Sequence, residues 1–112
     1  MAATSPLNVA TFGVTMIFEW DDAKNRVNVR KHGLDFADAV KMFQGILVVE
    51  ADTREDYGEK RWRGIGTIDG RTTVVIFAEL AAETIRIISL RRADHEERED
   101  YKKAIQNGLE AG

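Results

Sequence analysis

Arginines on two predicted strands are the residues of this 112-residue chain best suited to bind phosphate. Side chains alternate between the two faces of a strand, so Arg61 and Arg63 share one face of theirs. On the last strand the same alternation places Arg91 on the face of Ile87, opposite Arg86. Arginines that end neighbouring antiparallel strands can converge on one phosphate and bind it bidentately.

The same arginines could instead pair with acidic side chains across the sheet. The candidate partners are Glu59, Glu79 and the carboxylates of the turn at 94–97. Exposed pairs of this kind contribute little to stability. The residue types alone leave the phosphate-binding and the ion-pairing interpretations equally open.

A polar stripe is predicted on the first helix, where Lys24, Asn28 and His32 recur every four residues. Such a stripe can face a ligand and would make His32 a candidate acid or base. His32 also directly precedes Gly33, a natural helix end. This position favours the simpler interpretation, in which the histidine caps the last carbonyls of the helix.

The composition excludes several kinds of catalytic site. The chain has no cysteine, which excludes disulfides, thiolate-bound metals and a cysteine nucleophile. With two histidines, no HExxH motif and no glycine-rich phosphate loop, we expect no metal and no cofactor. The acidic loop at 52–59 lacks the spacing of a calcium-binding EF-hand. The longest apolar run, at 74–78, is far too short for a membrane helix, and we expect a cytoplasmic protein.

The charge balance is acidic overall but uneven along the chain. Sixteen basic and 19 acidic residues give a net charge of −3, so the chain lacks the positive field typical of nucleic-acid binders. Basic residues concentrate at 24–31, 60–71 and 84–92, whereas acids dominate 50–59 and 94–100. A fold that gathers the three basic segments would form a cationic patch; otherwise each segment is solvated surface.

The spacing of apolar residues predicts one α+β domain with the element order β-α-α-β-β-β-β-α. Asp21 or Asp22 is expected to cap the first helix and Asp35 the second. A capping box of Asp94 and Glu97 opens the last helix, which we expect to reach about Ile105. The last four strands have short connections and must form an antiparallel meander, in a sheet of four to five strands with the helices on one face. We expect strands at 17–20, 46–50, 61–68, 72–80 and 84–91, and helices between 21 and 33, between 35 and 45 and from 94.

Residues 1–15 differ from the rest because they carry no charge and include the single proline. We interpret them as a flexible leader, followed by a single domain at 16–106 and a frayed tail at 107–112. Two alternatives stay open: a start of the protein at Met16, where a stronger structural pattern begins, and an added edge strand formed by the alternating pattern from Val9 to Thr15.

Three blocks of sequence follow one another from about Met16 to Tyr101. The first holds Phe18-Glu19-Trp20-Asp21, Lys24, Asn28 and Lys31-His32-Gly33; the second is Gly58-Glu59-Lys60-Arg61-Trp62-Arg63-Gly64-Ile65-Gly66; the third is Arg86-Ile87-Ile88-Ser89-Leu90-Arg91-Arg92-Ala93 with Glu97 and Tyr101. Together the blocks resemble the BrnT family of bacterial type II toxins.

This resemblance implies a RelE-like fold, a ribonuclease activity that inhibits translation, and an RNA substrate held in a cleft of arginine strands. It also implies neutralisation by a BrnA-like antitoxin in a hetero-oligomer that contacts DNA only through the antitoxin. The chain departs from the family pattern at 94–100, which is acidic here and usually basic in the family. This departure leaves open weak RNA binding, or lost activity with retained antitoxin binding.

On this basis we predict a metal-independent endoribonuclease that uses the RNA 2′-hydroxyl as nucleophile. Arg61 and Arg91 would stabilise the charged phosphorane, and Glu59, at the mouth of the strand of Arg61, would be the base. His32 is the alternative base or acid. The predicted RNA contacts are Lys24, Arg63, Arg86 and Arg92.

The rival interpretation is a non-enzymatic module. Its basic strands would hold an antitoxin-like protein or a nucleic acid. Such a protein would need the arginines but neither Glu59 nor His32.

Overall fold

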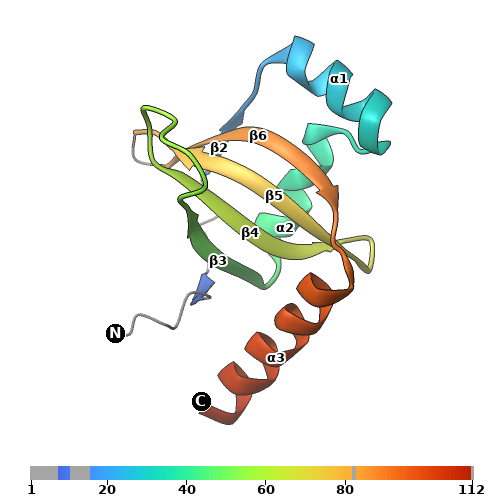
Figure 1. Ribbon diagram of the computed structural model, residues 1–112, viewed down its shortest axis with the longest axis vertical. Helices are drawn as coiled ribbons and strands as arrows, with labels where there is room; N and C mark the ends of the chain where they lie inside the picture. Colours follow the sequence, from blue (N-terminus) through green and yellow to red (C-terminus); the bar gives the residue numbers. More distant parts are fainter. Residues whose placement is uncertain (1–7, 11–15, 82, 112) are drawn as a thin grey trace.

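A six-stranded mixed sheet forms the centre of the computed structural model, which describes residues 8–10, 16–81 and 83–111 (Figure 1). The strand order is β1-β3-β4-β5-β6-β2. The strands are β1 (Asn8–Ala10), β2 (Ile17–Glu19), β3 (Leu47–Asp52), β4 (Arg61–Ile68), β5 (Arg71–Glu79) and β6 (Thr84–Arg92). The helices are α1 (Asp22–His32), the 3₁₀ helix η2 (Phe36–Ala39), α2 (Val40–Gln44) and α3 (His95–Ala111). The predicted α+β class and the order of its elements are confirmed.

The antiparallel meander from β3 to β6 is also confirmed, with Asp69 and Gly70 both at positive φ in the turn between β4 and β5. The sheet is not purely antiparallel, however, because β2 pairs in parallel with β6. The whole meander separates these two strands, so no short turn imposes an antiparallel pairing. A sixth strand, β1, pairs with β3. It falls within the predicted leader, of which residues 1–7 and 11–15 lie outside the described residues.

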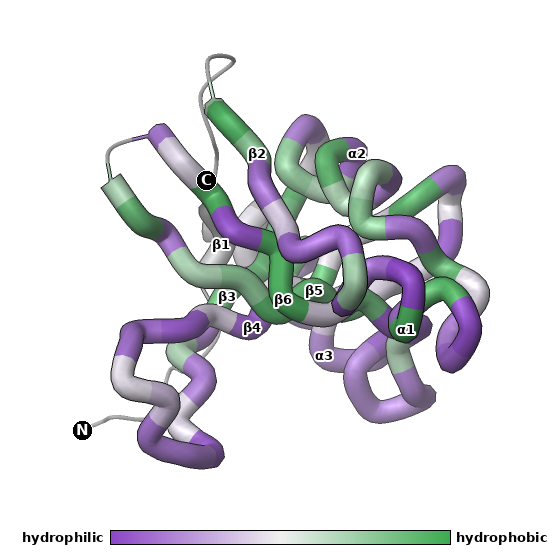
Figure 2. The backbone as a smooth tube through the Cα atoms, turned by 90° about the horizontal axis from the view of Figure 1, so that it is seen from above, coloured by the Kyte–Doolittle hydropathy of each residue, from purple (hydrophilic) through white to green (hydrophobic). Residues whose placement is uncertain are grey.

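Helices cover both faces of the sheet, so the expectation of helices on one face is wrong. Phe36, Met42 and Phe43 of η2 and α2 pack on one face, whereas Tyr101 of α3 packs on the other. The reason lies in the strands, because consecutive apolar residues, as at 47–49, leave both faces in need of cover. Figure 2 shows the mainly hydrophobic central strands beside the mainly hydrophilic α3. We call the face covered by α3 the α3 face.

Asn28 anchors α1 beside β6. Its Nδ2 donates to the carbonyls of Leu34 and Leu90 at 2.9 Å each, and its Oδ1 accepts from the Leu90 N–H at 3.2 Å. The helix begins at the Asp21 cap and ends at Gly33, whose φ of 70° is the left-handed conformation that glycine adopts readily. The buried amide therefore fixes how the polar residues of α1 lie along β6.

A β-bulge in β6 changes which of its side chains share a face. The strand pairs Phe77 with Ile87 and Ile76 with Ser89, which leaves Ile88 as an extra residue. Beyond the bulge Leu90 joins the core under α2, and Arg91, opposite Val74, turns to the α3 face. The predicted alternation, which placed Arg91 with Ile87, is wrong because the bulge adds one residue.

The capping box that starts α3 is present as predicted. The Glu97 N–H donates to Asp94 Oδ1 at 2.8 Å, and the Asp94 N–H donates to Glu97 Oε1 at 3.0 Å. The helix continues to Ala111, beyond the expected end near Ile105. Within the described residues no helix has the length and the apolar character needed to cross a membrane.

Candidate functional site: an arginine face on the sheet

Four of the predicted arginines gather on the α3 face. Arg61 and Arg63 come from β4, and Arg86 and Arg91 from β6. The bulge brings Arg91 to this side, and acidic residues link the arginines to one another, as described next. We call this part of the α3 face the arginine face; it consists of Arg61, Arg63, Arg86 and Arg91.

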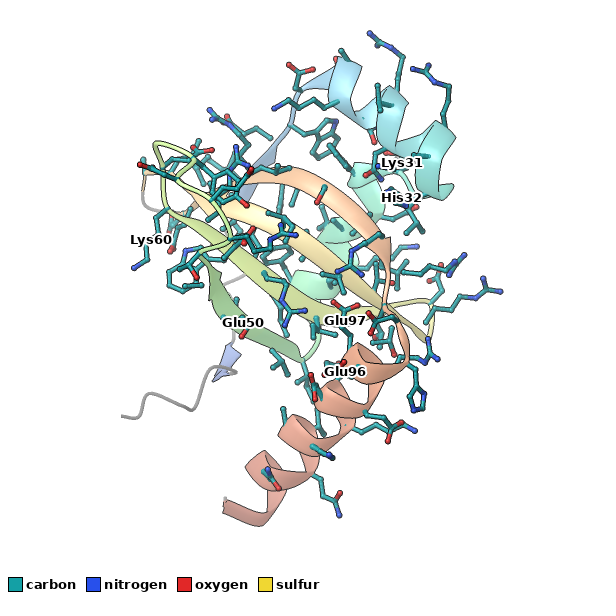
Figure 3. All side chains as sticks on the ribbon, viewed as in Figure 1. Lys31, His32, Glu50, Lys60, Glu96 and Glu97 are labelled. Atoms are coloured by element: carbon teal, nitrogen blue, oxygen red, sulfur yellow. The ribbon has the colours of Figure 1, made fainter. Side chains whose placement is uncertain are left out.

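The first ion-pair chain runs across β6, α3, β4 and β3. Both Nη groups of Arg91 donate to the carboxylate of Glu97 at 2.8 Å, and Nη1 of Arg63 donates to the same carboxylate at 2.8 Å. Arg63 also donates to Glu50, from Nε at 2.7 Å and from Nη2. Figure 3 shows Glu97 between α3 and the strands, with Glu96 on the same helix. This chain ties α3 to the sheet through charged groups.

Glu97 is the centre of that chain. Its side chain is 11% exposed. The hydrogen bonds from Arg91, helped by the Asp94 N–H and by the charges of Arg91 and Arg63, lower its pKa from 4.5 to about 2, against the opposing effect of burial. The same hydrogen bonds raise the pKa of Arg91. Near neutral pH Glu97 is therefore a carboxylate anion held between the guanidinium groups of Arg91 and Arg63.

The second ion-pair chain surrounds Glu59, the predicted base. Arg61 Nε donates to Glu59 at 3.2 Å, and Nη1 of Arg86 lies 3.8 Å from the same carboxylate. Arg86 also pairs with Glu19 of β2 at 3.2 Å. Glu59 thus lies beside Arg61, as its sequence position suggested, and it links β4 to β6.

The loop before β4 stacks an aromatic ring on Arg61. The guanidinium carbon of Arg61 lies 4.1 Å from the ring centre of Tyr57. The Tyr57 hydroxyl donates to Asp52 at 3.3 Å, and Arg54 donates to Asp52 from Nε at 2.8 Å and from Nη2 at 2.9 Å. These bonds, that of Arg54 foremost, lower the pKa of Asp52, whose side chain is 2% exposed. The sequence interpretation missed both Tyr57 and Asp52, because the loop looked like solvated acidic surface.

A pocket of about 410 Å³ opens beside Arg61 on this face. We call it the arginine pocket; it is lined by Arg54, Glu55, Tyr57, Arg61, Ile76, Ile88 and Ser89. The described hydrogen bonds of the Arg61 side chain engage its Nε, and none is found from its Nη groups within the described part of the chain. Among the four arginines of the face, Arg61 therefore combines a place in the pocket lining with Nη groups that have no described hydrogen-bond partner.

A second cavity, of about 380 Å³, lies between α1 and β6. We call it the α1–β6 cleft; it is lined by Ala23, Lys24, Val27, Asn28, Lys31, His32, Ile88 and Ser89. Ile88 and Ser89 line both cavities, so the cleft adjoins the arginine pocket. Lys24, Asn28 and His32 thus share the side of α1 that lines this cleft, and α1 ends at His32 with Gly33 as its C-cap.

The cleft favours the neutral form of His32. Burial lowers the pKa of the imidazole, and the nearby charges of Lys31 and Arg91 lower it further. Figure 3 shows Lys31 and His32 on the side of α1 that faces the sheet. A neutral imidazole can donate or accept a hydrogen bond.

Arg92 lies apart from these groups, since it follows Arg91 on the strand and points to the other face.

The described residues contain no group of three or more His, Cys, Asp or Glu side chains placed to hold a metal ion.

A model of the family described as "Ribonuclease toxin, BrnT, of type II toxin-antitoxin system" matches residues 20–97. The chain belongs to the BrnT family. The match includes the arginine face and ends at Glu97, so both ion-pair chains lie almost wholly within the BrnT region.

The fold agrees with this assignment. The chain is similar to the crystal structure of the Brucella abortus ribonuclease toxin, BrnT, with 32% identity and a TM-score of 0.56. The likeness covers 72% of this chain and 100% of the Brucella chain. No curated protein matches the chain. As a BrnT-family protein, the chain is a toxin of the type II toxin–antitoxin class, a class defined by an antitoxin partner.

Proposed function

We propose that the protein is an endoribonuclease that cleaves RNA without a metal ion and thereby inhibits translation. The observation that carries the proposal is the gathering of four arginines on one face, with Arg61 lining a pocket. We further propose that a BrnA-like antitoxin neutralises it.

The proposed reaction needs no nucleophile from the protein. The RNA 2′-oxygen attacks the adjacent phosphorus, and its proton passes to a base. The bond from phosphorus to the 5′-oxygen breaks, and that oxygen takes a proton from an acid. The products are a 2′,3′-cyclic phosphate and a 5′-hydroxyl end. The phosphorane formed on the way carries extra negative charge, which guanidinium groups stabilise.

The geometry ranks the candidate residues for these roles. Arg61 stands first for phosphate stabilisation, because its Nη groups have no described partner while Tyr57 and Glu59 hold the rest of its guanidinium. Arg91 stands second, because both of its Nη groups already bind Glu97 and a phosphate would have to share them. Glu59 is the candidate base because it lies beside Arg61. His32 is the candidate acid or alternative base because it lines the adjoining cleft.

The remaining predicted contacts fall into two groups. Lys24 lines the α1–β6 cleft, where it can meet a neighbouring phosphate of the RNA. Arg63 and Arg86 each bind two carboxylates, so we propose that they mainly shape the face and hold its carboxylates in place.

The non-enzymatic binding module remains the second candidate because of the ion pairing. Each arginine of the face binds at least one carboxylate, so the face is close to neutral. A neutral face binds an RNA backbone weakly. It would still suit a protein partner that supplies its own polar groups.

RNA cleavage in the presence of EDTA separates the two candidates. We expect the purified protein to cut single-stranded RNA, and Arg61→Ala to lower the rate by a factor of about 10²–10³, the usual effect of removing one charge-stabilising donor. Arg71→Ala is the matched control, since Arg71 is exposed at the far end of β5. Failure of the folded, partner-free protein to cut any RNA would favour the binding module.

A further inference from the structure

The α1–β6 cleft combines an apolar lining with a cationic rim. Ala23, Val27 and Ile88 supply apolar surface, and Lys24 and Lys31 supply two ammonium groups. None of the described residues that line the cleft is acidic. This composition suits a flat, apolar group attached to an anion, which is the chemistry of a nucleotide.

We propose that the α1–β6 cleft is a nucleobase-binding subsite, which holds the base next to the phosphate bound in the arginine pocket. The inference rests on the proposed ribonuclease function and adds to it the part of the substrate that is recognised. The two cavities share Ile88 and Ser89, so a single nucleotide step can place its phosphate on one side of these residues and its base on the other.

The β-bulge creates this arrangement. In a regular strand Ile88 and Ser89 would point to opposite faces, whereas both are half-buried beside the two cavities here. Ile88 can then pack against a base, and the Ser89 hydroxyl can bind a base edge or a ribose.

The polar groups of the cleft have distinct parts in base binding. The amide of Asn28 is occupied by Leu34 and Leu90, so it serves as a wall and not as a ligand. His32 is not so occupied in the described structure, and its lowered pKa favours the neutral ring. A neutral imidazole can stack on a base or hydrogen-bond to its edge. The two lysines can meet the phosphates that flank the base.

A protein segment could also enter an apolar cleft, but two observations favour RNA. The rim carries positive charge without acidic neighbours among its lining residues, and the cleft shares Ile88 and Ser89 with the arginine pocket. A bound base must be unstacked, so the cleft selects single-stranded RNA.

The test uses the full chain and non-cleavable RNA probes, namely 2′-O-methyl hexanucleotides of A, C or U. Binding should shift the NMR signals of the His32 ring and the Ile88 methyl groups, and the three probes should differ in affinity. Ile88→Ala and Val27→Ala should each weaken binding of the preferred probe by about fivefold or more, as expected when a base contact is lost, and should reduce the difference between probes. Leu80→Ala is the matched control, because Leu80 is exposed outside both cavities.

The outcomes separate this inference from the proposed activity. Probe binding at His32 and Ile88 by a protein that cuts no RNA would support the nucleobase subsite and would exclude the proposed ribonuclease activity. RNA cleavage with unchanged KM and base preference in Ile88→Ala and Val27→Ala would overturn the subsite alone. The subsite is also overturned if the antitoxin shifts these signals and the probes do not.

Discussion

Glu97→Gln is a substitution whose effect on stability can be worked out from the structure. It removes the charge that holds Arg91 and Arg63 together while keeping nearly the same size and a carbonyl oxygen for the Asp94 N–H. Breaking these pairs leaves Arg91 without its described counter-charge and Arg63 with Glu50 alone.

The size of the effect follows from the pKa of Glu97. A folded-state value of about 2, against an ordinary value of 4.5, corresponds to about 3 kcal/mol of stability near neutral pH. Because the folded pKa is the lower one, this contribution is complete above about pH 4.5 and disappears as the pH falls towards 2. Glu97→Gln should therefore lose about 3 kcal/mol at pH 7 and much less near pH 2.

Urea unfolding followed by tryptophan fluorescence measures this free energy at each pH. Glu96→Gln is the matched control, since Glu96 is exposed in the same turn of α3 (Figure 3). Between pH 4.5 and 2 the free energy of unfolding should fall more steeply with pH in the parent than in Glu97→Gln. The variant should still lose some stability over this range, because the pKa values of Asp35 and Asp52 are also lowered. Equal stability of the two Gln variants at pH 7, or parallel acid profiles of the parent and Glu97→Gln, would refute the reasoning.

Two further predictions test the scaffold and the partner. Asn28→Ala should destabilise the fold by about 1–3 kcal/mol for each buried group left unpaired, foremost the Leu90 N–H. An unchanged free energy of unfolding in urea would show that other contacts hold α1 in place. A complex co-purified with the product of the adjacent gene should survive about 0.5 M salt, because apolar contacts are not screened. Its complete dissociation at that salt would show instead that the arginine face carries the binding.

Local signals in the sequence were enough to predict most of the fold. The aspartates at 21, 35 and 94 start the helices as capping residues should, and the Asp69–Gly70 turn fixes the hairpin between β4 and β5. These features depend on a few neighbouring residues, so they need no knowledge of the tertiary structure.

The arrangement of the site depended on long-range features that no local pattern shows. The bulge at Ile88 lies in an unbroken run of strand-forming residues, so alternation alone gave the wrong face for Arg91. The pairing of Arg63 with Glu97 joins residues 34 positions apart, and it exists because α3 docks on the sheet. Asp52 belongs to an acidic run and is nevertheless buried against Arg54.

The measurement that tests the proposed reaction most directly is cleavage of an RNA with one 2′-deoxynucleotide at the preferred site. In EDTA, the protein should cut the all-ribose RNA to a 2′,3′-cyclic phosphate end and leave the deoxy-substituted position intact, because the nucleophile has been removed. Cleavage at the deoxy position, or cleavage that appears only after Mg²⁺ is added, would contradict a reaction driven by the RNA 2′-hydroxyl and the arginine face.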